Sequence, residues 1–125
     1  MDILIAENLK KYYQMGGSVV KALDGIDISI PRGEFLAIVG SSGSGKSTLL
    51  HMMGGLDIPT SGKVLVDQKD LSIMSKDELT IFRRRKIGFV FQNYNLLSLM
   101  NVYENIVLPI KLDGIRPEKK YVDEI

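Results

Sequence analysis

Cysteine is absent from the sequence, and histidine occurs once, as His51. The lack of cysteine excludes disulfide bonds and thiolate zinc sites, and it suits a cytoplasmic protein. No apolar run approaches the ~20 residues that a transmembrane helix needs. The chain starts Met-Asp-Ile-Leu, with neither a basic lead-in nor a long apolar stretch, so we expect no signal peptide. Any association with a membrane would then depend on a partner.

An excess of charge of either sign is also absent. The 125 residues include 16 Lys and Arg against 15 Asp and Glu, which gives a net charge of +1. This balance of charges predicts neither nucleic acid nor an acidic membrane as a partner. With 45% apolar and 25% charged residues, the composition is that of a soluble globular protein, and the length allows one domain with a core.

Short apolar segments, separated by glycine, proline or polar turns, predict the strands of an α/β protein. Ile26, Ile28 and Ile30 alternate with polar residues, which is typical of a strand with one buried face. Residues 35–39 form a continuous apolar run, as expected for a strand buried on both faces. The predicted strands cover residues 3–9, 19–23, 26–30, 35–39, 63–67 and 87–91.

Capping residues mark the predicted helices. A serine or asparagine followed three residues later by glutamate forms a capping box, and glycines end a helix. These signals predict helices over residues 47–53 and 76–84, and another from residue 101 that a proline kinks or ends. A charged helix begins near residue 116. The residues that carry these signals are Gly54 and Gly55, Ser75 and Glu78, Asn101 and Glu104, and Pro109.

A glycine-rich loop between the strand at 35–39 and the helix at 47–53 carries the clearest chemical signal. Its glycines let the backbone curl around phosphates with N–H groups aimed inward, and the helix start adds partial positive charge. Lys46 is expected to reach the β- and γ-phosphates, and the Ser47 hydroxyl to bind Mg²⁺. A chance match in a chain of this length has a probability of about one percent. We therefore predict that the protein binds the triphosphate of a nucleotide, with MgATP the first candidate. The loop fits the pattern G-x-x-x-x-G-K-[ST] and consists of Gly40, Ser41, Ser42, Gly43, Ser44, Gly45, Lys46 and Ser47.

The segments around this loop resemble the N-terminal half of the ATPase domain of ABC transporters. Several ordered motifs at the family's spacing make the resemblance more specific than a phosphate-binding loop alone. Within the family, the basic run before Ile87 and the sequence of residues 91–96 most resemble one branch. This branch includes macrolide exporters, lipoprotein-releasing systems and antimicrobial-peptide exporters. The matching segments are residues 33–35, 41–50, 55–57, 59–62, 83–92, 95–97 and 104–106.

This resemblance implies a fold and a function. The implied fold is that of an α/β P-loop NTPase, in which residues 1–125 form part of one nucleotide-binding domain, with an antiparallel β subdomain and an incomplete RecA-like core. The implied function is that of an ATP-binding subunit that binds ATP with Mg²⁺ and energises export through a membrane permease. The implied partners are that permease and a second copy of the ATPase domain, at the inner face of the cell membrane, and no nucleic acid.

The resemblance also assigns roles to single residues. Tyr13 is implied to stack on adenine; the adjacent Tyr12 is an alternative, although the spacing to the Met-Gly that follows favours Tyr13. Gln92 is implied to touch Mg²⁺ or the attacking water, beside the catalytic role of Lys46, and its loop to face the membrane subunit. Thr48 is implied to join the phosphate-binding residues. The plainer interpretations are a tyrosine at a sheet edge and a glutamine that closes a strand.

Three elements of the family pattern are missing: an LSGGQ-like signature, an apolar strand that ends in Asp-Glu, and a switch histidine. His51 comes just after the phosphate-binding loop, and we interpret it as a surface or packing residue. Asp67 ends an apolar run, but residue 68 is glutamine, so we interpret Asp67 as a turn residue. We expect the chain to be part of a longer ATPase and residues 1–125 alone to be inactive in hydrolysis.

Two other functions stay open at this point: a stand-alone ATP-binding module that never hydrolyses ATP, and a soluble ABC-type ATPase of DNA repair or translation. The exporter-like sequence around Gln92 argues against the second. A GTPase is disfavoured because no Asn-Lys-x-Asp motif is present, and a small kinase because no arginine-bearing lid is recognisable. The basic run at residues 83–86 is interpreted as the cationic end of a helix rather than a nucleic-acid or lipid patch.

Overall fold

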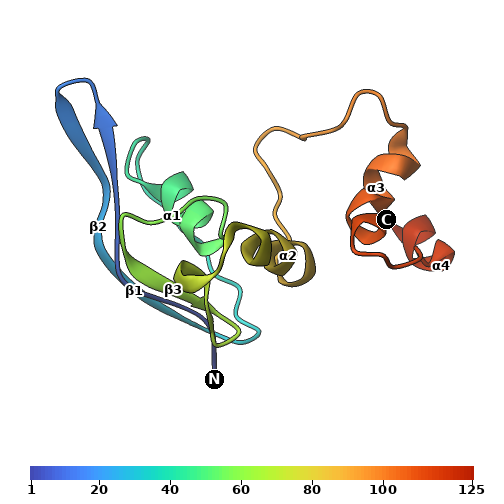
Figure 1. Ribbon diagram of the computed structural model, residues 1–125, viewed down its shortest axis with the longest axis horizontal. Coiled ribbons are helices and arrows are strands. Elements are labelled where there is room, and N and C mark those ends of the chain that lie inside the picture. The colour runs from blue at the N-terminus through green and yellow to red at the C-terminus, as the bar shows by residue number, and fades with distance from the viewer. The chain divides into compact units, whose positions relative to one another are not determined.

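A four-stranded antiparallel sheet in the order β2-β1-β3-β4 organises residues 1–79, the first of two units in the computed structural model, which describes all 125 residues. The second unit comprises residues 80–125 and is helical. Figure 1 labels the elements. The elements are β1 (Asp2–Met15), β2 (Ser18–Pro31), α1 (Lys46–Met53), β3 (Ser61–Val66), β4 (Lys69–Asp70), the 3-10 turn η1 (Leu71–Ile73), α2 (Lys76–Lys86), α3 (Val102–Leu112) and α4 (Lys119–Glu124).

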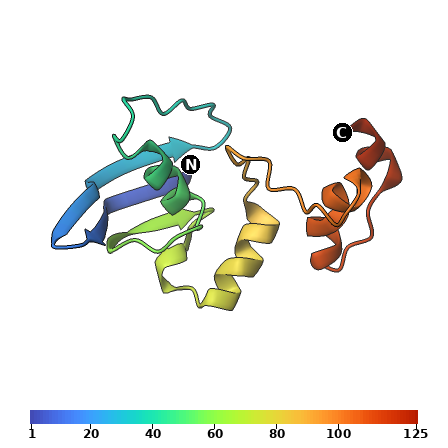
Figure 2. The same ribbon diagram turned by 90° about the horizontal axis from the view of Figure 1, so that it is seen from above.

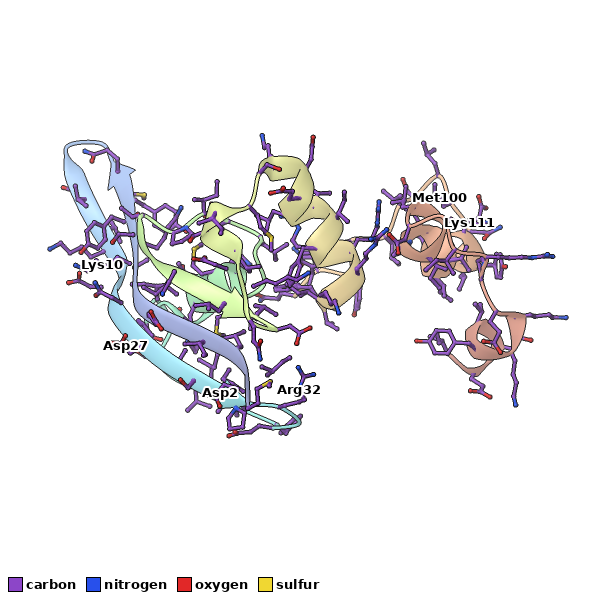
Figure 3. All side chains as sticks on the ribbon, turned by 60° about the horizontal axis from the view of Figure 1, so that its bottom comes forward. Asp2, Lys10, Asp27, Arg32, Met100 and Lys111 are labelled. Atoms are coloured by element: carbon purple, nitrogen blue, oxygen red, sulfur yellow. The ribbon has the colours of Figure 1, made fainter.

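β1 and β2 form one long hairpin with a turn between them at residues 16–17. The predicted strands at 19–23 and 26–30 are two parts of the single strand β2. A bulge in β1 lets the two long strands stay paired: Asn8 has a φ of 45°, and its N–H donates to Asp27 Oδ1 at 2.8 Å. Figure 3 labels Asp27 on the hairpin. The antiparallel β subdomain implied by the resemblance is therefore present.

α1 lies across one face of this sheet (Figures 1 and 2). The side chains that face each other there are apolar and almost fully buried: Leu9 in β1, Val64 in β3 and Met52 in α1. Burial of each such side chain contributes roughly 1.5–3 kcal/mol to stability. This core fixes α1, and with it the glycine-rich loop that leads into the helix, against the sheet.

Gly62 in β3 lies so close to β1 that no side chain fits. Its φ is +81°, and a Cβ atom would stand 2.3 Å from the carbonyl oxygen of Asn8 and 2.6 Å from that of Glu7. We expect Gly62→Ala to lower the free energy of unfolding by roughly 2–4 kcal/mol, because the backbone conformation and the clash both disfavour alanine. Chemical denaturation measures this loss. Gly17→Ala is the matched control, because a Cβ there meets no atom within 4 Å. Equal losses in both variants would contradict the close approach of β3 to β1.

Two of the predicted strands, residues 35–39 and 87–91, are not strands in the structure. No neighbouring strand exchanges backbone hydrogen bonds with either segment, and a strand needs such a partner for its N–H and C=O groups. Several of their apolar side chains are exposed instead, by 98% for Phe35, 85% for Val39 and 95% for Val90. The antiparallel β subdomain is thus present, while the RecA-like core is incomplete, as the fold class predicts.

The predicted helices form at the expected places. α1 covers the predicted residues 47–53 and ends at Gly54. At the start of α2, the N–H of Glu78 donates to Ser75 Oγ at 3.2 Å, and the N–H of Ser75 donates to Glu78 Oε2 at 2.8 Å. These reciprocal bonds satisfy backbone donors at the start of the helix, which is the reason the pattern predicts it. α4 lies within the segment where a charged helix was expected.

Asn101 and Glu104 form the second predicted capping box, at the start of α3. Pro109 lies inside α3, and the helix continues past it, so of the two predicted outcomes, a kink or an end of the helix, the structure excludes the end. Proline removes one N–H donor, whereas the N–H of Asp113 still donates to the carbonyls of Pro109 and Ile110, both at 3.2 Å, and holds the last turn. None of the helices combines the length and the apolar character needed to cross a bilayer.

Candidate nucleotide-binding site

The glycine-rich loop leads directly into the N-terminus of α1, and its residues 41–44 are exposed. Gly45 is the N-cap of the helix, with a φ of 95° in the left-handed region. A Cβ atom at Gly45 would lie 2.6 Å from the carbonyl oxygen of Ala22 and 3.4 Å from Leu23 Cδ2. Only glycine therefore lets the loop turn into the helix this close to β2.

The ammonium group of Lys46 lies inside the curve of the loop. Its Nζ donates to the carbonyl oxygens of Gly40 at 2.8 Å and Ser41 at 2.6 Å, and to Ser44 Oγ at 3.3 Å. The N–H of Ser44 in turn donates to the Ser41 carbonyl at 3.2 Å and closes the loop on itself. The loop thus holds a positive charge directly in front of the N-terminus of α1, where the helix dipole also favours an anion.

The first turn of α1 adds backbone donors to this charge. The N–H of Leu49 donates to the carbonyl of Gly45 at 2.9 Å, so it makes the first helical hydrogen bond. The N–H groups of Lys46, Ser47 and Thr48 precede it and have no partner within the helix. Ser47 is also exposed at this helix end. A phosphate chain that approaches the loop would meet these donors together with the ammonium group.

Tyr13 and Tyr12 lie on opposite faces of the hairpin, because successive residues of a strand alternate. Lys11 pairs across the hairpin with Leu23, which is buried and lies beside Gly45. The hairpin register shifts between Lys11 and Tyr12, but Lys11 Nζ lies 5.2 Å from the centroid of the Tyr13 ring, so Tyr13 shares the face of Lys11. Tyr12 lies on the other face, where its hydroxyl donates to the carboxylate of Asp24. Of the two candidates, Tyr13 alone shares the face of the sheet that carries the loop.

Asp57, which the sequence pattern does not single out, forms an ion pair with Lys11, whose ammonium lies 5.2 Å from the centroid of the Tyr13 ring. Its Oδ2 is 3.1 Å from Lys11 Nζ. Burial raises the pKa of the Asp57 carboxyl, but the hydrogen bond from the Ile58 N–H and the nearby Lys11 ammonium outweigh burial and hold the pKa below its ordinary value. The only sequence signal for Asp57 is its place in the Gly-Leu-Asp segment that matches the family, since nothing in one sequence pairs it with strand β1.

Gln92 belongs to the second unit, in an exposed segment without regular secondary structure that follows α2. The structure therefore brings together the loop, Lys46 and the face that bears Tyr13, all in the first unit. The contact of Gln92 with Mg²⁺ or water stays a prediction.

Asp67 forms a turn, as predicted. Asp67 and Gln68 link β3 to β4 with φ angles of 50° and 65°, the pair of left-handed residues typical of a two-residue hairpin. The Asp67 carboxylate is 2.7 Å from Nη2 of Arg32, which Figure 3 labels.

No group of three or more histidine, aspartate or glutamate residues gathers to hold a metal ion. His51 is exposed on α1, in agreement with its interpretation as a surface residue.

The family of the chain is decided by its match over residues 23–125 to the model described as ABC transporter. The chain belongs to the ABC transporter family. It is 52% identical over 103 residues to the macrolide export ATP-binding/permease protein MacB of Campylobacter fetus, a match that covers 82% of this chain and 16% of MacB. It is 44% identical over 115 residues to the lipoprotein-releasing system ATP-binding protein LolD of Pseudoalteromonas translucida, over 91% of this chain and 50% of LolD.

An import protein is also among the relatives of this ABC transporter chain. The methionine import ATP-binding protein MetN of Photorhabdus laumondii is 46% identical over 120 residues, which cover 94% of this chain and 35% of MetN. The chain thus spans half or less of the length of these relatives. The resemblance to ABC transporter ATPases is confirmed, and the relatives act in both directions of transport.

A solved structure gives the same fold. The ATP-binding cassette MJ0796 of Methanocaldococcus jannaschii, a dimer in a post-hydrolysis state bound to ADP and Pi, matches with a TM-score of 0.88 at 40% identity. The match covers 97% of this chain and 53% of that one. The fold of this chain is therefore that of the N-terminal part of an ABC ATPase cassette.

Proposed function

We propose that the chain is part of the ATP-binding subunit of an ABC transporter and that its glycine-rich loop binds the triphosphate of MgATP. The observation that carries this proposal is the place of the Lys46 ammonium, held inside the loop at the N-terminus of α1. Phosphate oxygens would replace the carbonyls of Gly40 and Ser41 as its partners. A charged group already placed in a curled loop at a helix start is suited to bind a polyphosphate.

The other residues of the proposed site act on the metal and on the base. Ser47, exposed in the first turn of α1, supplies the hydroxyl that would bind Mg²⁺. The N–H groups at residues 41–48 would bind phosphate oxygens. Tyr13 would stack on adenine, which its face of the sheet supports. Gln92 would contact the metal or the attacking water.

We further propose that residues 1–125 are one part of a longer nucleotide-binding domain. Residues 35–39 and 87–91 have the composition of core strands, yet Phe35, Val39 and Val90 are almost fully exposed. Large exposed apolar side chains in unpaired segments indicate a surface that another segment covers. In the longer protein, further strands would pair with both segments, and a second ATPase domain would complete the dimer, as in the MJ0796 structure.

The transport function is proposed to be export through a partner permease, with ATP hydrolysis as its energy source. MacB, named for macrolide export, and LolD, named for lipoprotein release, support this direction, and MetN makes import the alternative. The ATPase would then work at the inner face of the membrane, bound to its permease.

Gln92→Ala tests the link to a permease in a longer ABC transporter subunit that contains this sequence. We expect the variant to keep most of its ATP affinity and to lose most of its coupled transport, because Gln92 orients water or metal in the reaction and contributes little to binding. Transport into inverted membrane vesicles and ATP binding are measured side by side. Gln14→Ala, which removes another exposed glutamine side chain, is the control. Normal coupled transport by Gln92→Ala would contradict the proposed role.

A further inference from the structure

We propose that helix α3 fixes both ends of the segment that carries Gln92, with Asn105 and Asp113 as positioning residues for that glutamine. This inference rests on the proposed function, because it takes Gln92 as the side chain that meets the metal or the attacking water. The segment comprises residues 87–101, between the end of α2 and the start of α3. All of the contacts involved lie within the second unit.

The Asn105 side chain holds the later end of the segment. Its Oδ1 accepts the N–H of Leu97 at 2.8 Å. Its Nδ2 donates to the carbonyls of Leu97 at 3.2 Å, of Met100, which Figure 3 labels, at 3.1 Å, and of Asn101 at 2.9 Å. The N–H of Met100 also donates to the Leu97 carbonyl at 3.1 Å, so residues 97–100 form a turn. One amide side chain thus uses both its acceptor and its donors on a single turn, which calls for the mixed chemistry of an amide.

The start of α3 does not depend on Asn105. The N–H of Glu104 donates to Asn101 Oδ1 at 2.8 Å, and the N–H of Asn101 donates to Glu104 Oε1 at 3.2 Å. This capping box satisfies backbone donors at the helix start without any contribution from Asn105. Replacement of Asn105 should therefore leave α3 in place and release only the turn at residues 97–100.

Asp113, at the C-terminal end of α3, holds the earlier end of the segment. Its Oδ1 accepts hydrogen bonds from Nε of Arg84 at 3.0 Å and from Nε of Arg85 at 2.8 Å, and both arginines lie in the last turn of α2. The Asp113 side chain is only 13% exposed, so water screens these charges less than at an open surface. Two arginines that share one carboxylate thus attach the end of α2 to α3, immediately before the segment begins.

Fixed ends limit the positions that Gln92 can reach. Because both attachments are made to one helix, the chain between them is a closed loop, and loop closure removes much of the conformational freedom of an open chain. Gln92 then samples fewer positions before it meets the metal or the water. A misplacement of about 1 Å at a reacting group can cost up to ~100-fold in rate. Loss of either attachment should therefore lower the rate of the reaction rather than the affinity for ATP.

The test uses a longer ABC transporter subunit that contains this sequence, assembled with its permease. We expect Asn105→Ala and Asp113→Ala each to lower transport-coupled ATP hydrolysis roughly three- to tenfold, with MgATP affinity unchanged, because a freed end misplaces Gln92 only part of the time. Hydrogen exchange over residues 87–101, followed by mass spectrometry, should become faster in both variants. In a Gln92→Ala background, neither change should cause a further loss of rate, because both act through Gln92.

Lys111→Ala is the matched control, since this lysine lies in α3 and its ammonium is 5.9 Å from the centroid of the Tyr103 ring in the same helix; Figure 3 labels Lys111. It should leave the rate and the exchange unchanged.

Three results would overturn the inference: a wild-type rate in Asn105→Ala or Asp113→Ala, an equal loss of MgATP affinity, or a further loss in the Gln92→Ala background. In each of these cases a defect of Gln92→Ala alone leaves the proposed function standing. If Gln92→Ala itself keeps normal coupled transport, the proposed role of Gln92 fails and the inference fails with it.

Discussion

Replacing Lys46 with alanine is expected to weaken MgATP binding by roughly ten- to hundredfold, since a charge-assisted hydrogen bond contributes ~1.5–3 kcal/mol. The structure shows the ammonium group already inside the loop, on the carbonyls of Gly40 and Ser41. Binding of a triphosphate would exchange these neutral acceptors for charged oxygens, which form stronger bonds with a cation. The loss should therefore appear in affinity rather than in the fold.

Calorimetric titration of the purified chain with MgATP measures this loss. The stability of the variant has to be checked by chemical denaturation, because Lys46 also braces the loop through Ser44 Oγ at 3.3 Å. Lys63→Ala is the matched control, since Lys63 is a half-exposed lysine in the same unit and is paired with Glu7. An unchanged dissociation constant in a folded Lys46→Ala variant would contradict the proposed role.

Residues 1–125 alone are expected to show no multiple-turnover hydrolysis of ATP and a strong tendency to associate. Transfer of a phosphoryl group to water depends on metal ligands and a group that orients the water. The loop supplies Lys46 and Ser47, while Asp67 is occupied in a turn and in an ion pair with Arg32 at 2.7 Å. The association follows from the exposed apolar segments at residues 35–39 and 87–91, whose backbone groups have no strand partner.

Phosphate release in the presence of Mg²⁺ and ATP, measured on the monomer fraction beside a Lys46→Ala control, tests this expectation. Size-exclusion chromatography over a range of concentrations tests the association. Lys46-dependent multiple turnover by a well-behaved monomer would contradict the account. Asp67→Asn would then be the next variant to measure, because Asp67 is the carboxylate that follows an apolar strand.

Local signals in the sequence predicted most of the regular structure. The capping pairs at Ser75 and Asn101 set the starts of α2 and α3, because the hydrogen bonds that define a capping box join residues three apart. The glycines after α1 end that helix for an equally local reason. The apolar runs at 35–39 and 87–91 failed as predictions because a strand depends on a partner that a local pattern does not contain.

The candidate site was predictable to the same extent. The loop from Gly40 to Ser47 is contiguous, so its pattern gave every residue that the structure places there. The choice between Tyr12 and Tyr13 needed the register of the hairpin, which decides the face of each side chain. Asp57 was not predicted because its ion-pair partner Lys11 lies in β1, far away in the sequence, and only the fold brings the two side chains together.

The central claim, that the loop from Gly40 to Ser47 binds the nucleotide triphosphate, is tested most directly by amide NMR during titration with MgATP. The account predicts that the amide signals of Gly43, Gly45, Lys46 and Ser47 shift most, because their N–H groups would donate to phosphate oxygens. The same signals should shift far less at equal ligand concentration in Lys46→Ala. Saturable shifts centred on another part of the chain, such as the turn at Asp67, or identical shifts in Lys46→Ala, would contradict the account.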